Sequence, residues 1–189
     1  ERVRKRFAAL VGADPDEAAF TKSVAEGLNA VAAAFPWRDG DNVVVCPDLE
    51  HPSNVYPWLR LQRVGGIEVR KVPARDGRMP VDRMVEAVDE RTRLITVSTV
   101  SFAPGFRTDL APLAEVCRRQ GIFLLADGAQ SVGMLHADVG RLGVDGLSVS
   151  TQKGLLGFYG MGLLYCRREW AERMHPAYVA RFSIDLGGA

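Results

Sequence analysis

The sequence has few of the features that mark secreted, membrane-bound or metal-binding proteins. It has three cysteines, Cys46, Cys117 and Cys166, and no C-x-x-C spacing, which argues against a disulfide framework and a cysteine-based zinc site. No apolar run approaches the roughly 18 residues that a membrane span needs. The opening Glu-Arg-Val-Arg-Lys-Arg lacks the apolar core of a signal peptide. We therefore expect a cytoplasmic protein that makes no membrane contact.

Excess charge of one sign is also missing. Lysine and arginine total 24 against 23 acidic residues, so the net charge of +1 gives no electrostatic footprint for nucleic acid. Any phosphate must therefore be bound by local groups. Nothing resembles a cluster of His, Cys and carboxylate ligands, so we expect no metal. No G-x-G-x-x-G follows the first apolar run, which argues against a dinucleotide-binding domain.

What is present is ordinary globular composition, 47% hydrophobic and 25% charged over 189 residues, enough for one domain with a buried core. From residue 41 onward, β-branched runs alternate with amphipathic stretches, which predicts a three-layer α/β/α domain around a mainly parallel sheet. The predicted strands are Asn42–Cys46, Ile67–Val72, Leu94–Ser98, Phe123–Ala126, Gly146–Ser150 and Met161–Cys166. The predicted helices are Ala25–Ala34, Ser53–Val64 (with Ser53 as N-cap), Val81–Ala87, Leu110–Gln120 and Arg168–Met174.

Polar residues that follow apolar strands are the first candidates for a site, because ligands collect at the carboxyl ends of strands in open α/β sheets. Asp127 follows Phe-Leu-Leu-Ala. A buried carboxylate is costly unless a cation or several donors meet it. Asp127 either caps the following loop or meets a cationic ligand, and its position alone does not separate the two.

A second strand end carries Ser150, Gln152 and Lys153, followed by a glycine-rich stretch. A lysine among glycines and small hydroxyls has little apolar surface to cover, unlike one on a helix flank. Lysine amines form Schiff bases with carbonyl compounds, which is how pyridoxal phosphate enzymes hold their aldehyde. A third place, Ser23-Val24-Ala25 at the start of a helix, offers free N–H groups that favour an anion.

Together these segments resemble the class V aminotransferase and cysteine desulfurase family of fold-type I pyridoxal-phosphate enzymes, over nearly the whole chain. In that family one strand ends in Asp-Gly-Ala-Gln, found here at Asp127 to Gln130, and a later strand ends in Ser-x-His/Gln-Lys, found here at Ser150 to Lys153. The resemblance implies that Lys153 carries pyridoxal 5'-phosphate as a Schiff base and that Asp127 keeps the ring nitrogen protonated. It also implies a homodimer with its active sites at the subunit interface.

Further roles come from the same resemblance. Gln130 is expected to bond the phenolic oxygen of the cofactor, and Ser150 and Gln152 to hold its phosphate. The phosphate is also expected to lie at the helix entered through Ser23, Val24 and Ala25, although the family usually has Thr-Thr where this chain has Val24-Ala25. His51 falls where the family places a ring that stacks on the pyridine.

The segment from Val97 to Asp109 matches the part of the family that passes near the cofactor and substrate. Thr99 replaces the asparagine usual in desulfurases, and the ending Gly-Phe-Arg-x-Asp looks more like the isopenicillin-epimerase-like branch. We expect Arg107 and Asp109 to bind each other or to fix the turn. None of the three cysteines is expected to carry a persulfide.

The sequence therefore predicts an enzyme of the aminotransferase class V type that acts on a small-molecule amino acid by amino-group transfer or related epimerase chemistry. Cysteine desulfurase or selenocysteine lyase chemistry is the alternative within the enzymes. A non-catalytic module that keeps the fold is the alternative of another class. We expect residues 1–189 to form part of the large, cofactor-binding domain, with an N-terminal segment and a C-terminal small domain belonging to a longer parent.

Overall fold

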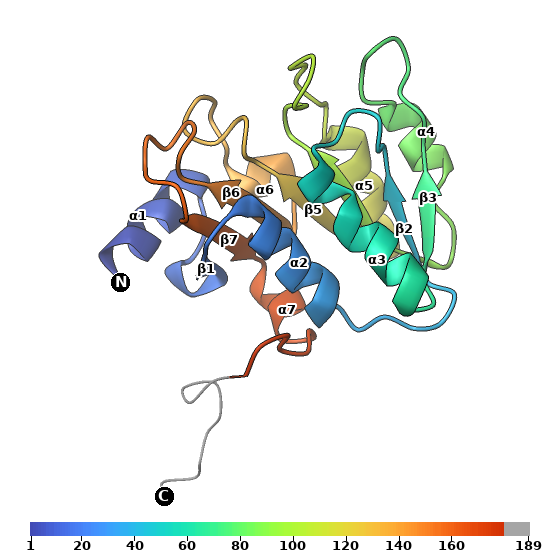
Figure 1. Cartoon of the computed structure of the whole chain (residues 1–189), viewed down its shortest axis with the longest axis horizontal. Helices are drawn as coiled ribbons and strands as arrows, with labels where there is room; N and C mark the ends of the chain where they lie inside the picture. Colours follow the sequence, from blue (N-terminus) through green and yellow to red (C-terminus); the bar gives the residue numbers. More distant parts are fainter. Residues whose placement is uncertain (180–189) are drawn as a thin grey trace, which may run out of the picture.

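The computed structural model describes residues 1–179, which form a seven-stranded sheet with helices on both faces (Figure 1). The strands are β1 Ala18–Thr21, β2 Asn42–Val45, β3 Glu68–Lys71, β4 Thr92–Ser98, β5 Phe123–Asp127, β6 Gly146–Ser150 and β7 Gly162–Cys166. The α-helices are α1 Arg2–Val11, α2 Val24–Ala34, α3 Tyr56–Val64, α4 Val81–Glu86, α5 Ala111–Gln120, α6 Val139–Leu142 and α7 Arg168–Ala171. Short 3-10 turns, η1 and η2, span Pro15–Glu17 and Pro52–Asn54. None of the described helices is long and apolar enough to cross a membrane.

The strands lie in the order β1-β7-β6-β5-β4-β2-β3. From β6 to β3 all neighbours are parallel, and β7 runs antiparallel between β6 and β1. The predicted α/β/α class with a mainly parallel sheet is confirmed. Because the parallel strands point the same way, their carboxyl ends and the loops that follow meet at one edge.

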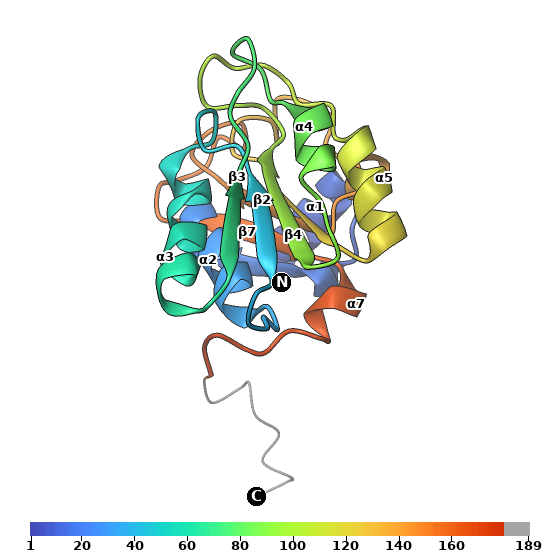
Figure 2. The same cartoon turned by 90° about the vertical axis from the view of Figure 1, so that its right-hand side faces the viewer.

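Side chains of alternate strand residues enter two separate apolar cores, as the period of two in a strand requires. In β4, Leu94 packs with Leu28 of α2 and Trp58 of α3 on one face. Ile95 packs with Leu113 of α5 and with residues of α1 and α4 on the other. Seen along the sheet, α2 and α3 lie on one side and α1, α4 and α5 on the other (Figure 2). Burial on both faces explains why the central strands read as continuous apolar runs.

All six predicted strands are present within two residues of their expected ends, but β1 was not predicted. It is a four-residue edge strand with two exposed residues, too short for a recognisable strand pattern. The prediction that a helix begins at Ser53 is wrong. Ser53 lies in η2, whose N-cap is His51, and α3 begins only at Tyr56. Pro57 in the first turn fits a start at Tyr56, because the N–H group that proline lacks would have no intrahelical partner there.

The last predicted helix is shorter than expected. It ends at Ala171 instead of Met174, and the chain continues through a turn into residues 175–179. Trp170, which is buried against the α2 and α3 face, is the side chain that holds this short helix on the sheet. A single anchoring residue gives no helical period that would fix the end of the helix from sequence.

Candidate functional site

A cavity of about 390 Å³ opens at the carboxyl ends of β4, β5 and β6. It is bounded by the start of α2 and by the loops that follow β2, β5 and β6. All nine residues predicted to form the site line this cavity: Ser23, Val24, Ala25, His51, Asp127, Gln130, Ser150, Gln152 and Lys153. Ser53, Ser98, Phe102, Ala129 and Tyr159 complete the wall. The fold thus brings residues from distant parts of the sequence to one place, while their individual roles stay predictions.

Asp127 is the last residue of β5 and is buried. Its Oδ1 accepts a hydrogen bond of 2.8 Å from the backbone N–H of Ala129, so the expected loop cap exists. Burial raises the pKa of this carboxyl, and the Ala129 bond and the positive charge of Lys153 act in the opposite direction. Within residues 1–179 no hydrogen bond to Oδ2 is present. This oxygen can therefore meet a cationic donor in the cavity without breaking the cap.

Lys153 lies in the loop between β6 and β7, and its side chain is exposed to the cavity. Two glycines fix this loop. A Cβ on Gly133 would lie 2.3 Å from the carbonyl oxygen of Gly154, and Gly133 has a φ of 92° that favours glycine. The backbones that follow β5 and β6 therefore touch directly. This contact joins the loop that carries Lys153 to the turn that follows Asp127, and both residues line the cavity.

The start of α2 is seated closely on β6. The hydroxyl of Ser23 caps the helix by accepting from the N–H of Glu26 at 3.2 Å, and the hydroxyl of Ser148 donates to the carbonyl of Val24 at 2.9 Å. Gly27 permits this approach, because a Cβ there would lie 2.3 Å from the Ser148 oxygen. The N–H groups in the first turn of a helix lack intrahelical partners, so they can bind an anion.

Ser150, at the end of β6, strengthens the case for an anion. Its side chain is buried, and its hydroxyl oxygen has no hydrogen-bond partner among residues 1–179. Buried hydroxyls without partners are rare, because leaving one unpaired costs roughly 1–3 kcal/mol. A phosphate oxygen at this point would satisfy it.

His51 lines the cavity and contacts Ser53 and Phe102. Its Nδ1 accepts from the backbone N–H of Ser53 at 3.2 Å and lies 3.0 Å from the Ser53 hydroxyl. Phe102 packs edge-on against the imidazole, with 5.1 Å between the ring centroids. An imidazole fixed at two points is suited to stack on a planar ligand.

Sequence reasoning missed the individual residues Ser98, Phe102 and Tyr159, although the segment from Val97 to Asp109 was expected to lie near a cofactor. Arg107 and Asp109 form no ion pair in the described structure. Instead Asp109 accepts from the N–H of Ala111 at 3.1 Å and so fixes the entry into α5. For Asp109, the geometry therefore supports the expected turn-fixing role and not an ion pair with Arg107.

The three cysteines lie away from the cavity lining. Cys46 and Cys117 are buried and Cys166 is partly buried. Burial raises the pKa of Cys46 to about 11 and also raises the pKa of Cys117 and Cys166. All three are protonated at neutral pH, and a thiol rather than a thiolate is a poor nucleophile.

Comparison with known proteins gives a consistent result. The model of the family "Aminotransferase class-V" matches residues 1–185. A probable cysteine desulfurase of Methanothermobacter thermautotrophicus is 40% identical over 178 residues, which cover 93% of this chain and 44% of that protein. The solved apo structure of a cysteine desulfurase from Thermococcus onnurineus superposes with a TM-score of 0.90 at 31% identity, covering 97% of this chain and 46% of that one.

A third similar protein is a C-DES mutant solved with glycine covalently linked to its PLP cofactor, with a TM-score of 0.88 at 27% identity, covering 95% of this chain and 48% of that one. The chain thus spans about half the length of the relatives that it matches. The match of the family model to nearly every residue, together with the shared fold, shows that the chain belongs to the aminotransferase class-V family.

Proposed function

We propose that this chain is the cofactor-binding part of a pyridoxal-phosphate enzyme that acts on the amine of an amino acid or a related primary amine. The observation that carries the proposal is the single cavity that holds a lysine amine, Lys153, and a buried carboxylate, Asp127, with one oxygen free. Membership of the class V family supports the choice of cofactor.

The cavity fits this cofactor at three points. Asp127 is a buried carboxyl that forms no salt bridge within the described part of the chain, which suits the protonated nitrogen of a pyridine ring. Ser150 offers a buried hydroxyl that no other described residue bonds, beside the start of α2, which suits a phosphate. His51 is fixed between Ser53 and Phe102, which suits a planar ring.

When bound, pyridoxal phosphate supplies an aldehyde that captures amines and a ring that draws electrons from the α-carbon of the substrate. The Lys153 amine would hold the aldehyde and, after the substrate amine replaces it there, would accept the α-proton as a general base. The Asp127 carboxylate would keep a proton on the ring nitrogen. Ser150 and the N–H groups of Val24 and Ala25 would bind the phosphate, with Gln152 beside them, and Gln130 would bond the phenolic oxygen.

The remaining half of the length seen in the relatives is proposed to supply the small domain. We further propose that the groups that bind the substrate carboxylate and any reactive cysteine come from that part. The high pKa of the three cysteines described above supports this, because none of them offers a thiolate. The same free thiols are compatible with a reducing cytoplasm.

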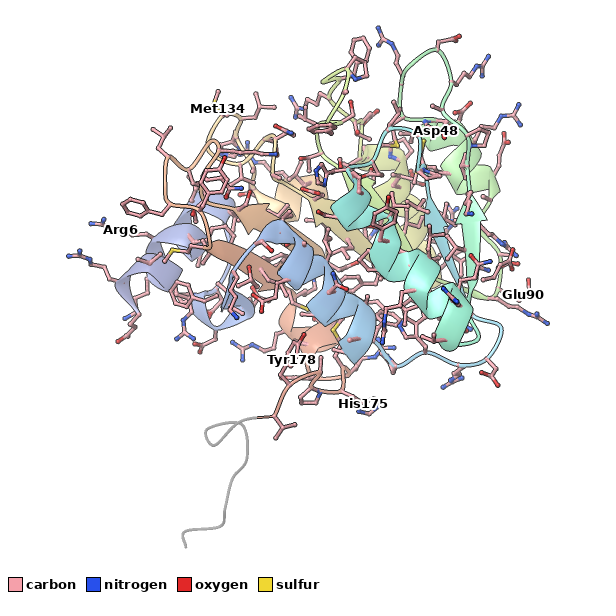
Figure 3. All side chains as sticks on the ribbon, viewed as in Figure 1. Arg6, Asp48, Glu90, Met134, His175 and Tyr178 are labelled. Carbon is pink, nitrogen blue, oxygen red and sulfur yellow. The ribbon has the colours of Figure 1, made fainter. Side chains whose placement is uncertain are left out.

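A homodimer is part of the proposal, and an exposed apolar surface supports it. Large apolar side chains gather on the loops near the cavity: Met134, Leu156, Phe158 and Tyr159 are 72%, 91%, 86% and 87% exposed. Figure 3 shows Met134 on the loops at one end of the molecule and His175 and Tyr178 at the opposite end. Exposed apolar groups of this kind are typical of interaction sites and support the proposal of a second copy beside the cavity.

Cysteine desulfuration is the second candidate, favoured by the names of the similar proteins from Methanothermobacter and Thermococcus. Cysteine desulfuration and amino-group transfer both begin with capture of the substrate amine, so the cavity could serve either reaction. Assay of the full-length protein with cysteine, and separately with an amino acid plus a keto acid, distinguishes them: sulfide release indicates desulfuration, and a new amino acid indicates transfer.

Lys153→Ala tests the cofactor assignment itself. Wild-type protein mixed with pyridoxal phosphate is expected to show a visible absorbance band and to become permanently labelled after borohydride reduction. The variant is expected to show neither, because it lacks the amine that holds the aldehyde. A variant that still gives a borohydride-reducible band would contradict the role of Lys153.

A further inference from the structure

We infer that Glu50 is a positioning residue, which ties the segment that carries His51 to the end of β4 and so sets the width of the cavity. The inference rests on the proposed function, because it concerns how the cavity is shaped for its cofactor. Glu50 does not line the cavity and lies behind it, with only 6% of its surface exposed.

Three donors converge on the carboxyl group of Glu50. Its Oε1 accepts from the backbone N–H of Ser98 at 2.6 Å, and its Oε2 accepts from the Ser98 hydroxyl at 2.5 Å and from the amide Nδ2 of Asn54 at 2.8 Å. An ionised carboxylate accepts all three bonds at once, because neither oxygen carries a proton. Bonds to a charged acceptor are stronger than those between neutral groups.

These bonds connect the two sides of the cavity. Asn54 is the last residue of η2, the turn that His51 caps. Ser98 ends β4, lines the cavity, and lies in register with Asp127 on the neighbouring strand β5. Glu50 therefore links the segment that carries His51, whose ring would stack on the cofactor, to strand β4. This strand lies beside Asp127, whose carboxylate would pair with the ring nitrogen of the cofactor.

Stability alone does not account for a charged group at this position. Within residues 1–179 no lysine or arginine forms a salt bridge with Glu50, and burying an unpaired charge is costly. Burial and the nearby charge of Asp127 raise the pKa of Glu50 to about 7, against the opposing effect of the bonds from Ser98 and Asn54. We attribute the presence of this destabilising buried carboxyl to its role in positioning the segment of His51 relative to the end of β4.

Glu50→Gln separates positioning from stability, because it keeps the volume but offers one acceptor oxygen and turns an NH₂ toward two donors. At pH 8, we expect the variant to bind pyridoxal phosphate about tenfold more weakly in an absorbance titration of the apo-protein. The absorbance maximum of the bound cofactor should also shift. The urea midpoint of the apo-protein should not fall, since a buried charge is removed. A merely structural role predicts that affinity and midpoint fall together.

Asp145→Asn is the matched control. Asp145 is also 6% exposed, accepts from the N–H of Leu124 at 3.0 Å and pairs with Arg167 at 2.9 Å, but it lies at the amino end of β6, far from the cavity. This control should lower the urea midpoint and leave cofactor affinity unchanged. Unchanged affinity and spectrum in Glu50→Gln, or an equal loss of affinity in Asp145→Asn, would overturn the inference. Failure of the wild-type protein to bind the cofactor would overturn the proposed function and this inference with it.

Discussion

Replacing Asp127 by asparagine separates the two roles that the geometry leaves to this residue. Asparagine keeps a side-chain oxygen that can accept from the N–H of Ala129, so the loop cap at 2.8 Å survives. What is lost is the negative charge that the second oxygen would present to a protonated ring nitrogen. The substitution is nearly isosteric, so no cavity forms in the core.

The size of the effect follows from the burial of Asp127. A hydrogen bond to a charged partner contributes about 1.5–3 kcal/mol, which corresponds to a loss of about 10-fold to 100-fold in cofactor affinity. Because the site is buried, added salt should restore little of the affinity. The apo-protein should be at least as stable as the wild type in urea, because the cost of burying the charge disappears.

The assay is an absorbance titration of apo-protein with pyridoxal phosphate, beside urea unfolding of the same apo-protein. Turnover should fall by more than the affinity does, since a ring without its proton draws electrons less strongly. If Asp127→Asn binds the cofactor as tightly as wild type and turns over substrate at a similar rate, Asp127 is a loop cap and the pairing with the ring is refuted.

Three other outcomes are expected. Burial raises the pKa of Glu50 from its ordinary value near 4.5 to about 7, so the protonated carboxyl stabilises the folded state below pH 4.5, and about 3 kcal/mol of this stability is lost as the pH rises through 7. The change in unfolding free energy between pH 5 and pH 8, measured in urea, should therefore be smaller for Glu50→Gln than for the wild type, and an equal change in both proteins would speak against this. Gly133→Ala should weaken cofactor binding, because the new Cβ would lie 2.3 Å from the backbone of Gly154. The control Gly77→Ala, at a φ of 68° with nothing within 4 Å, should lower stability and leave cofactor affinity unchanged. Equal effects of the two substitutions on cofactor affinity would refute the role of the close contact. Phe158→Asp, at a side chain 86% exposed, should shift the protein toward monomer in light scattering, and an unchanged mass would remove this surface from the proposed interface.

The central strands could be predicted because both of their faces are buried. In β5 every residue is buried, so the sequence shows an uninterrupted apolar run that ends at Asp127. Such a run predicts the strand, its end, and the position of a candidate functional residue at that end. The opposite holds for β1, where two exposed residues in a four-residue edge strand leave no pattern to recognise.

The candidate site could be predicted as a set of positions but not as a geometry. Motif resemblance named Lys153 and His51, and the fold places both on one cavity. Glu50 directly precedes His51 in the sequence, yet its bonds to Ser98 depend on a contact between residues 48 positions apart. Long-range pairings of this kind are set by the register of the sheet, which a single sequence does not reveal.

The connection between β6 and β7 carries both the Lys153 amine and the exposed side chains of Leu156, Phe158 and Tyr159. One short stretch of backbone would thus face the cofactor at its start and the second copy at its tip. Under the proposed dimer, contacts at the tip of the loop would add to the contact between Gly133 and Gly154, which holds its start within one chain. Specific activity would then depend on protein concentration, falling on dilution below the dissociation constant of the dimer and returning when the protein is concentrated again.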